Sequence, residues 1–194
     1  MKSFTFVSFS TKMQYPRGAE SYKSLGTAFE ELSQRALSSL GITSYIYGGS
    51  GDAGVDLRGH WNLRPDLSIP VIAQCKRTSK PLAPLFIREL EGVFQRQATS
   101  SNALSFMISR TEATKQSLEH LLSSNVPMIF MMLSGEDDNE SFIIKQAIMN
   151  LSAQSLVPGL LVTSRRIPKK KGSGFDHLPR FVFEGRLLME KSAG

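Results

Sequence analysis

The chain has 194 residues, and 41% of them are hydrophobic, which is enough for one domain with its own core. Its net charge of +6 and pI near 9.6 suit a polyanionic partner but favour nucleic acid only weakly. Cys75 is the only cysteine, which excludes an internal disulfide or a cysteine-built metal site and suits a reducing compartment. The three histidines are scattered, so no zinc site is expected. No apolar run approaches the length of a membrane span, so we expect an intracellular, soluble chain outside the membrane.

The first 18 residues contain Lys2, Lys12 and Arg17 among serines and threonines, without any acidic residue. This composition is typical of a mitochondrial targeting segment. An ordinary flexible amino terminus, or an early strand over residues 4–9, fits the same stretch. Both interpretations stay open, and the first predicts a mitochondrial location.

A helix is predicted before Gly41, because apolar residues recur at helical spacing from Leu25 to Leu40. Gly41 stands where a left-handed carboxyl cap is expected. On the helical wheel Glu30 falls on the flank of the apolar stripe, whereas Glu31 points nearly opposite. Glu30 could complete a capping box that starts at Thr27, or it could reach toward a functional centre.

Three short strands follow, predicted over residues 43–47, 55–58 and 69–77, with a Gly-rich turn before the second and a polar loop over 60–68. The turn brings Asp56 to the start of the second strand; Asp52, within the turn, is as well explained by bonding to nearby backbone. Gln74 and Lys76 share one face of the third strand, because side chains alternate along a strand. Two polar residues on one face of an interior strand indicate that this face opens onto something.

The next stretch alternates helices and apolar strands. Residues 85–97 are predicted as a helix with Leu85, Leu90, Val93 and Phe94 inward, and 103–109 as a strand. Thr111 is expected to cap a helix that reaches Ser124 and buries Leu118, Leu121 and Leu122, before a buried strand over 128–133. This order predicts a parallel, right-handed crossover.

Residues 135–194 are predicted as a C-terminal extension packed on a core of residues 19–134. Residues 142–153 fit either a strand or a helix, and 160–163 and 181–183 are predicted as strands. Residues 165–174 form a basic stretch flanked by glycine and serine, expected to be a loop. It is either a solvated charge run or a phosphate contact.

The Gly-Asp-x-Gly-x-Asp turn at 51–56, followed by Gln74-x-Lys76, resembles the PD-(D/E)XK, or restriction-endonuclease-like, nucleases. It is most similar to their Mrr-like branch, in which glutamine replaces the second acid. The resemblance covers residues 28–133 and implies an α/β fold: an α-β-β-β-α-β core with a central mixed sheet flanked by helices. The Phe29-Glu30 pair matches the glutamate of the family's first helix.

The resemblance implies a Mg²⁺ site, with Mn²⁺ able to substitute, held by Asp56, Gln74, Glu30 and the backbone carbonyl of Cys75. Mg²⁺ prefers oxygen ligands, and one or two carboxylates suffice. Lys76 would position the attacking water or stabilise charge on the phosphate. A plain ion pair between Asp56 and Lys76 is the alternative. Contacts to nucleic acid are expected from seven basic residues: Arg58, Arg77, Arg165, Arg166, Lys169, Lys170 and Lys171.

These residues predict a metal-dependent DNA endonuclease. The alternative is a catalytically inactive nuclease-fold protein that binds DNA, and the Gln74 substitution leaves room for it. The chain is also similar to a fungal mitochondrial subgroup required for respiratory growth. The sequence leaves a homodimer open.

Overall fold

The computed structural model describes residues 22–47, 54–97, 102–135, 142–169 and 173–188. The segment 1–18, Asp52, Lys170 and Lys171 lie outside the described residues, so the expectations placed on them stay predictions.

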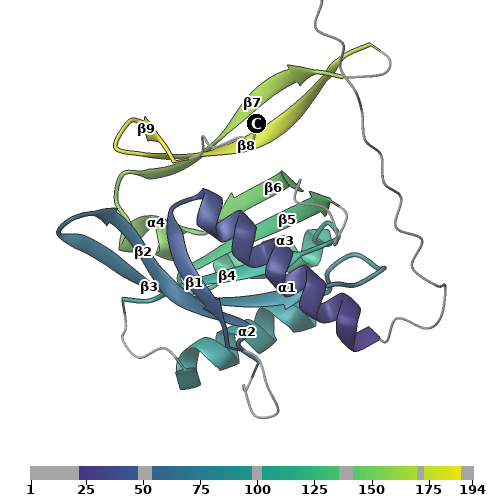
Figure 1. Ribbon diagram of the computed structural model, residues 1–194, viewed down its shortest axis with the longest axis horizontal. Coiled ribbons are helices and arrows are strands. Elements are labelled where there is room, and N and C mark those ends of the chain that lie inside the picture. Colours follow the sequence, from purple (N-terminus) through teal and green to yellow (C-terminus); the bar gives the residue numbers. More distant parts are fainter. Residues whose placement is uncertain (1–21, 48–53, 98–101, 136–141, 170–172, 189–194) are drawn as a thin grey trace, which may run out of the picture.

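A six-stranded mixed sheet forms the centre of the molecule (Figure 1). Its strands follow chain order across the sheet: β1 (Ile42–Ile46), β2 (Leu57–Arg64), β3 (Leu67–Lys76), β4 (Leu104–Ser109), β5 (Met128–Gly135) and β6 (Phe142–Met149). The first three strands form an antiparallel meander, and β3, β4 and β5 run parallel. β6 then returns antiparallel to β5 as the sixth strand.

Helices cover both faces of this sheet. Helix α1 (Tyr22–Ser39) packs with one buried cluster, whereas α2 (Pro84–Gln97) packs with another that also holds the apolar residues of α3 (Lys115–Ser123). The predicted α-β-β-β-α-β order and the mixed sheet between helices are confirmed.

The alternation along β3 decides which helix each side chain meets. Val71 and Ala73 belong to the α1 cluster, whereas Ile72 belongs to the α2 cluster. Because side chains alternate, Gln74 and Lys76 share the face of Ile72 and therefore lie on the α2 side.

Helix α1 confirms the predicted phase: Glu30 is half-buried and Glu31 is exposed. Gly41 has the left-handed φ of 83° expected of the cap. The capping-box interpretation of Glu30 is wrong, because the helix begins at Tyr22 and Thr27 therefore lies within it.

The polar loop expected over residues 60–68 is wrong. Strand β2 runs to Arg64 and β3 starts at Leu67, with a tight turn between them. Trp61 is fully buried within this hairpin, and its Nε1–H donates to the carbonyl of Leu40 at 2.9 Å. The buried tryptophan outweighs its polar neighbours, which point to the solvent side of the same strand.

Two details of the helices also differ from the expectation. Thr114, not Thr111, caps α3, and its Oγ1 accepts a hydrogen bond from the backbone N–H of Ser117 at 3.2 Å. Leu85 and Leu122, both expected to be buried, are 55% and 54% exposed. The buried face of α2 is formed by Ile87 and Leu90, and that of α3 by Leu121, so Leu85 and Leu122 lie beside these faces.

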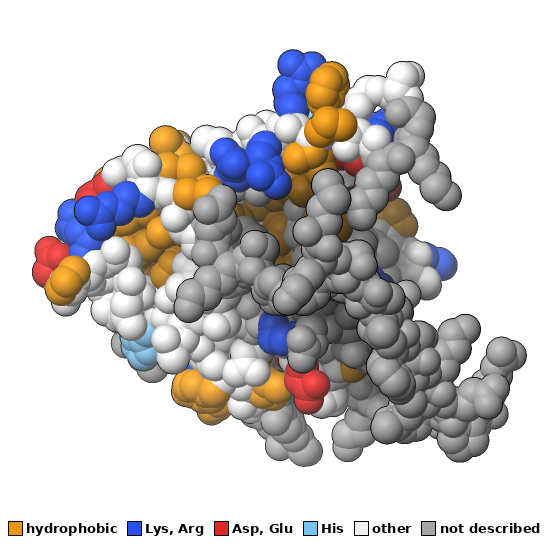
Figure 2. Space-filling view, turned by 45° about the horizontal axis from the view of Figure 1, so that its top comes forward, with side chains coloured by type: hydrophobic (Ala, Val, Ile, Leu, Met, Phe, Trp, Pro, Cys, Tyr) orange, Lys and Arg blue, Asp and Glu red, His pale blue; other side chains and the backbone are white. Residues whose placement is uncertain are grey.

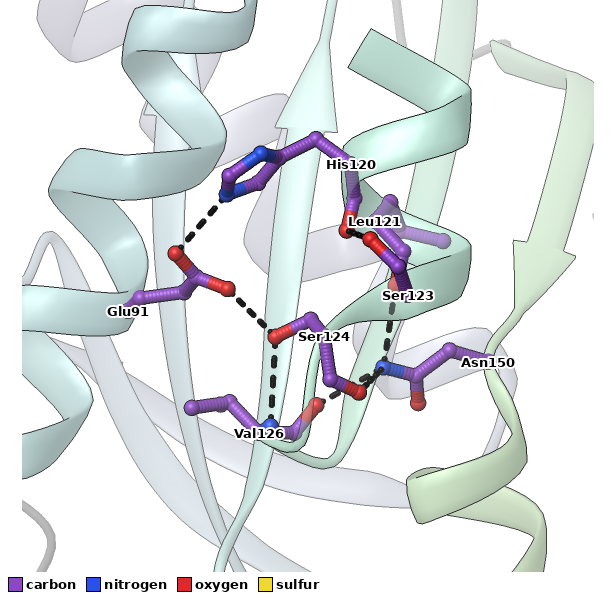
Figure 3. Close-up of polar contacts among 7 residues, drawn as sticks. All are labelled: Glu91, His120, Leu121, Ser123, Ser124, Val126 and Asn150. Carbon is purple, nitrogen blue, oxygen red and sulfur yellow. Dashed lines mark hydrogen bonds and ion pairs between the residues drawn. The ribbon is translucent and has the colours of Figure 1, made fainter.

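Asn150 connects α3, β5 and the short helix α4 (Leu151–Leu156), which it caps (Figure 3). The residue is fully buried. Its Nδ2 group donates to the carbonyls of Leu121, Ser124 and Val126, and its Oδ1 accepts from the backbone N–H groups of Met128 and Ala153. Glu91 joins α2 to α3, because its carboxylate contacts both His120, at 3.0 Å, and Ser124, at 2.5 Å.

The C-terminal part forms a second, three-stranded sheet of β7 (Leu160–Pro168), β8 (Phe175–Phe183) and β9 (Arg186–Leu187). Residues 142–153 therefore form a strand and the start of a helix, and both late strands are longer than predicted. Arg165 and Arg166 lie within β7 rather than in the expected loop, because antiparallel pairing continues to Pro168 and Phe175. Leu160 and Phe181 join the α1 cluster, which fixes the base of this hairpin to the main sheet.

Candidate functional site

The carboxylate of Asp56 lies beside the end of β3. Its Oδ2 accepts a hydrogen bond from the backbone N–H of Cys75 at 2.6 Å. The β2–β3 ladder ends at the pair of Leu57 and Ala73, so the Asp56 side chain contacts β3 where the neighbouring strand no longer pairs with it.

The backbone of β3 directs a carbonyl to the same side. Carbonyls alternate along a strand, and those of Ala73 and Lys76 accept from Asp56 N on the β2 side and from Arg110 N on the β4 side. The carbonyl of Cys75 therefore points to the β2 side, where the Asp56 carboxylate lies. This is the direction that a backbone ligand beside Asp56 requires.

Gln74 carries a buried acceptor. The residue is only 3% exposed, and its Oε1 has no hydrogen-bond partner within the described part of the chain. Its Nε2 lies near Gly54, where an added Cβ would meet it at 3.3 Å and the Val93 side chain at 2.9 Å. Gly54 also has a φ of 88°, so glycine is required for this close approach.

Lys76 lies two residues after Gln74, on the same face of β3, and contacts helix α2. Its Nζ is 3.1 Å from Glu89 Oε2 and 5.0 Å from the centre of the Phe86 ring. The Lys76 side chain is 23% exposed and that of Glu89 is 45% exposed, so the pair is open to solvent on one side. Sequence reasoning missed Glu89, because only the placement of α2 against the end of β3 brings it here.

The pKa of the Cys75 thiol depends on the charges of three predicted site residues. Burial raises the pKa of this thiol, and the negative charges of Asp56 and Glu30 raise it further. A hydrogen bond with Ser33 and the positive charge of Lys76 act in the opposite direction. Asp56 also contacts Cys75 directly through the backbone N–H, and Glu30 is half-buried on α1.

The donor set at the end of β3 suits a hard cation. A carboxylate, a buried amide oxygen and a backbone carbonyl are the kinds of oxygen ligand that Mg²⁺ prefers. No group of three or more His, Cys, Asp or Glu side chains with metal-site geometry occurs among the described residues. A cation here would therefore depend on amide, carbonyl and water oxygens as well as on carboxylates.

The predicted nucleic-acid contacts fall into two groups. Arg58 is half-buried; its guanidinium donates to Gln97 Oε1 at 2.6 Å and lies 4.3 Å from the centre of the Tyr47 ring. Arg77 is exposed directly after β3. Arg165, Arg166 and Lys169 are exposed on or just after β7, away from the end of β3 in sequence and in sheet.

The sequence model of the family described as Required for respiratory growth protein 7 matches residues 21–70 and 66–157. These ranges include Glu30, Asp56, Gln74 and Lys76, and all six strands of the main sheet. The chain belongs to the Required for respiratory growth protein 7 family. The expected similarity to proteins required for respiratory growth is thereby confirmed.

The chain is also similar to an uncharacterized mitochondrial protein of Schizosaccharomyces pombe, 32% identical over 139 residues. The alignment covers 71% of this chain and 55% of that protein, so the chain spans about half the length of its relative. Among solved structures the chain is similar to the MspJI restriction endonuclease in complex with a 27-mer oligonucleotide, at a TM-score of 0.42 and 18% identity. That similarity covers 56% of this chain and 26% of the endonuclease. Within the described residues, no helix is both long and apolar enough to cross a membrane.

Proposed function

We propose that this member of the respiratory-growth family is a metal-dependent DNA endonuclease of the PD-(D/E)XK type, with the Mrr-like Gln-x-Lys variant. The observation that carries the proposal is the presence of two features at the end of β3. The Asp56 carboxylate is held by the Cys75 amide, and the buried Oε1 of Gln74 is left without a partner among the described residues. An orphaned buried acceptor costs about 1–3 kcal/mol, and a bound cation would remove this cost.

Asp56, Gln74 and the Cys75 carbonyl would hold Mg²⁺ or Mn²⁺, with Glu30 nearby or in contact through water. The bound ion would supply charge neutralisation on the phosphate and a lower pKa of bound water. Asp56 is positioned for this by its bond to the Cys75 amide, which fixes its rotamer. Gln74 contributes a neutral ligand, so the site would hold its cation more weakly than one built from three carboxylates.

Lys76 would orient the attacking water or stabilise charge on the scissile phosphate. Glu89 and the Phe86 ring support this role, because they hold the ammonium group on the α2 side of β3 while leaving it partly exposed. The aromatic ring attracts a cation through its negative face.

DNA is the proposed substrate. The net charge of +6 suits a polyanion, and Arg77, Arg165, Arg166 and Lys169 are exposed for contact with phosphates. The lysines Lys170 and Lys171 would extend this contact. Arg58 would contribute less, since Gln97 and Tyr47 already engage its guanidinium.

A mitochondrial site of action is part of the proposal. It is supported by the description of the family and by the relative named as mitochondrial. The amino-terminal residues 1–18, basic and without acids, are consistent with import.

The second candidate function is DNA binding without cleavage. The observation that favours it is the Lys76–Glu89 ion pair, since a lysine engaged by a helix carboxylate is less available to a water or phosphate. In that case the fold would present its basic surface to DNA while the end of β3 served packing only.

Incubation of the purified chain with supercoiled plasmid separates the two candidates. The endonuclease predicts nicked and linear plasmid with Mg²⁺ or Mn²⁺ and intact plasmid with EDTA. Intact plasmid in all three conditions, together with a gel shift, would identify the binding protein instead.

A further inference from the structure

The β7–β8 hairpin has two chemically different faces. The pairing register places alternate residues of both strands on one face, which we call the groove face: Leu160, Val162, Ser164, Arg166 and Pro168 with Phe175, His177, Pro179, Phe181 and Phe183. Its base is buried against the main core, through Leu160 and Phe181. Its outer half, from Ser164 and Arg166 to Phe175 and His177, is exposed.

A groove runs between this face and the outer strand of the main sheet. It has a volume of about 400 Å³ and is lined by Lys145, Gln146 and Ala147 of β6, Val162, Thr163 and Ser164 of β7, and His177 and Pro179 of β8. Pockets for small ligands span about 300–1,000 Å³. The groove therefore has room for one or two nucleotide units, and a double helix could not enter it.

An exposed aromatic ring stands at the outer end of the groove face. Phe175 is 51% exposed, and the guanidinium carbon of Arg166 lies 4.9 Å from the centre of its ring. In Figure 2 basic and hydrophobic side chains adjoin at the top of the molecule, where Figure 1 shows the hairpin. An exposed ring beside an arginine offers both a surface for base stacking and a charge for the adjoining phosphate.

The charge on the groove face has one sign. None of its ten residues is acidic, and Lys145 and Arg166 lie at the groove and beside it. Asp176 lies on the opposite face of the hairpin, and Glu184 is bound to Arg64 at 2.6 Å. A polyanion would thus meet no carboxylate of the hairpin along this face.

Along the strand direction, the groove lies at the same position in the main sheet as the candidate site at the end of β3. Residues in register form one row across the sheet, from Lys76 through Ser109 and Met132 to Gln146. Three strand spacings separate Lys76 from Gln146, which is about 14 Å. β5 and β7 also run toward the same side of the molecule in Figure 1.

We infer that the groove between β6 and the β7–β8 hairpin binds an unpaired DNA strand, with Phe175 stacking on a base and Arg166 and Lys145 contacting phosphates. The inference deepens the proposed function and rests on it in one respect, because it assigns the endonuclease a substrate with a single-stranded portion next to the cut site. Stacking on one face of a base requires an unpaired base, since the faces inside a duplex are already covered. A surface that offered only positive charge would not discriminate between single-stranded and duplex DNA.

Fluorescence anisotropy with a labelled oligothymidylate and a labelled duplex of equal length tests the inference. EDTA is present throughout, so binding is measured without cleavage. Phe175→Ala should weaken single-strand binding about 5- to 150-fold, the loss of one stacked base, and change duplex binding little. Phe175→Tyr should bind the single strand as the natural chain does, because tyrosine keeps the stacking surface.

Leu161→Ala is the matched control. Leu161 is also exposed, at 47%, and lies on the same hairpin but on its opposite face. It should bind both probes as the natural chain does, and thermal unfolding should show all variants folded. Unchanged single-strand binding in Phe175→Ala, or equal losses on single strand and duplex, would overturn the inference. Failure of the plasmid to be cut would leave this binding result standing, so the two proposals fail separately.

Discussion

The Nζ of Lys76 lies 3.1 Å from Oε2 of Glu89, so a residue from helix α2 holds the lysine at the end of β3. If Glu89 positions Lys76 for catalysis, Glu89→Gln should lower the cleavage rate while leaving DNA affinity nearly unchanged. Lys76→Ala should lower it further, by about 10²–10⁴-fold, the usual contribution of one acid–base group. Single-turnover cleavage of labelled DNA measures both.

Glu119 provides the control for Glu89. It pairs with Lys115 at 3.7 Å on the exposed side of α3, so Glu119→Gln removes the same charge from a pair remote from β3. Cleavage by this variant should match the natural chain. A Glu89→Gln variant that cleaves faster would mean that Glu89 restrains Lys76 instead of positioning it.

Gln74→Glu introduces a carboxylate at a buried amide oxygen that has no hydrogen-bond partner among the described residues. Without metal this variant should lose stability, on the order of 3 kcal/mol, because a buried charge lacks compensation. A divalent cation should restore it, so the rise in Tm on adding Mg²⁺ or Mn²⁺ should exceed that of the natural chain. Gln116→Glu, at an exposed position of α3, should show neither effect. Equal metal-induced shifts in the natural chain and Gln74→Glu would mean that Gln74 does not face the ion.

Glu30 and Glu31 form a matched pair on adjacent positions of α1. Of the two, Glu30 is half-buried and Glu31 is exposed. Glu30→Gln should reduce cleavage strongly with little loss of stability, whereas Glu31→Gln should affect neither. Plasmid cleavage and thermal unfolding of the two variants check this, and equal activity losses would contradict the proposed role of Glu30.

Asn150 is expected to be the most sensitive polar residue for stability. Asn150→Ala removes hydrogen bonds to three carbonyls and two N–H groups of buried backbone, and only the Leu121 and Ser124 carbonyls keep another donor that we identify, so the loss should reach about 3 kcal/mol. Asn62→Ala, at an exposed position of β2, should cost less than about 0.5 kcal/mol. Urea unfolding of both variants measures the difference, and similar midpoints would remove Asn150 from its structural role.

Local patterns sufficed for the main architecture. The apolar stripe from Phe29 to Leu40 and the glycine at position 41 predicted α1 and its end, and the fully apolar β4 and β5 predicted the parallel centre of the sheet. These signals depend on spacing within one element, so the sequence carries them completely.

Features that depend on pairing between distant segments were missed. Arg165 and Arg166 suggest a loop by composition, yet pairing with Leu178 and His177 makes them part of a strand. Trp61 was hidden among polar residues whose exposed faces only the β2–β3 register reveals.

The candidate site divides in the same way. The alternation along β3 placed Gln74 and Lys76 on one face in advance, and the structure adds the contact of Asp56 with the Cys75 amide. Glu89 could not be predicted, because its contact arises from how α2 packs against the end of a strand.

The role of Asp56 is the central claim, and a substitution that keeps its shape tests it best. Asp56→Asn retains an oxygen for the Cys75 amide but removes the charge that would hold the cation. Asp66→Asn is its control, because Asp66 is 76% exposed in the β2–β3 turn and pairs only with Arg64 among the described residues.

The decisive measurement is cleavage of supercoiled plasmid in Mg²⁺ by the natural chain, Asp56→Asn and Asp66→Asn, with DNA binding measured in parallel. The account predicts cleavage by the natural chain and Asp66→Asn, and a loss of at least about a hundredfold in Asp56→Asn with DNA binding retained or improved. Cleavage by Asp56→Asn at the natural rate would contradict it.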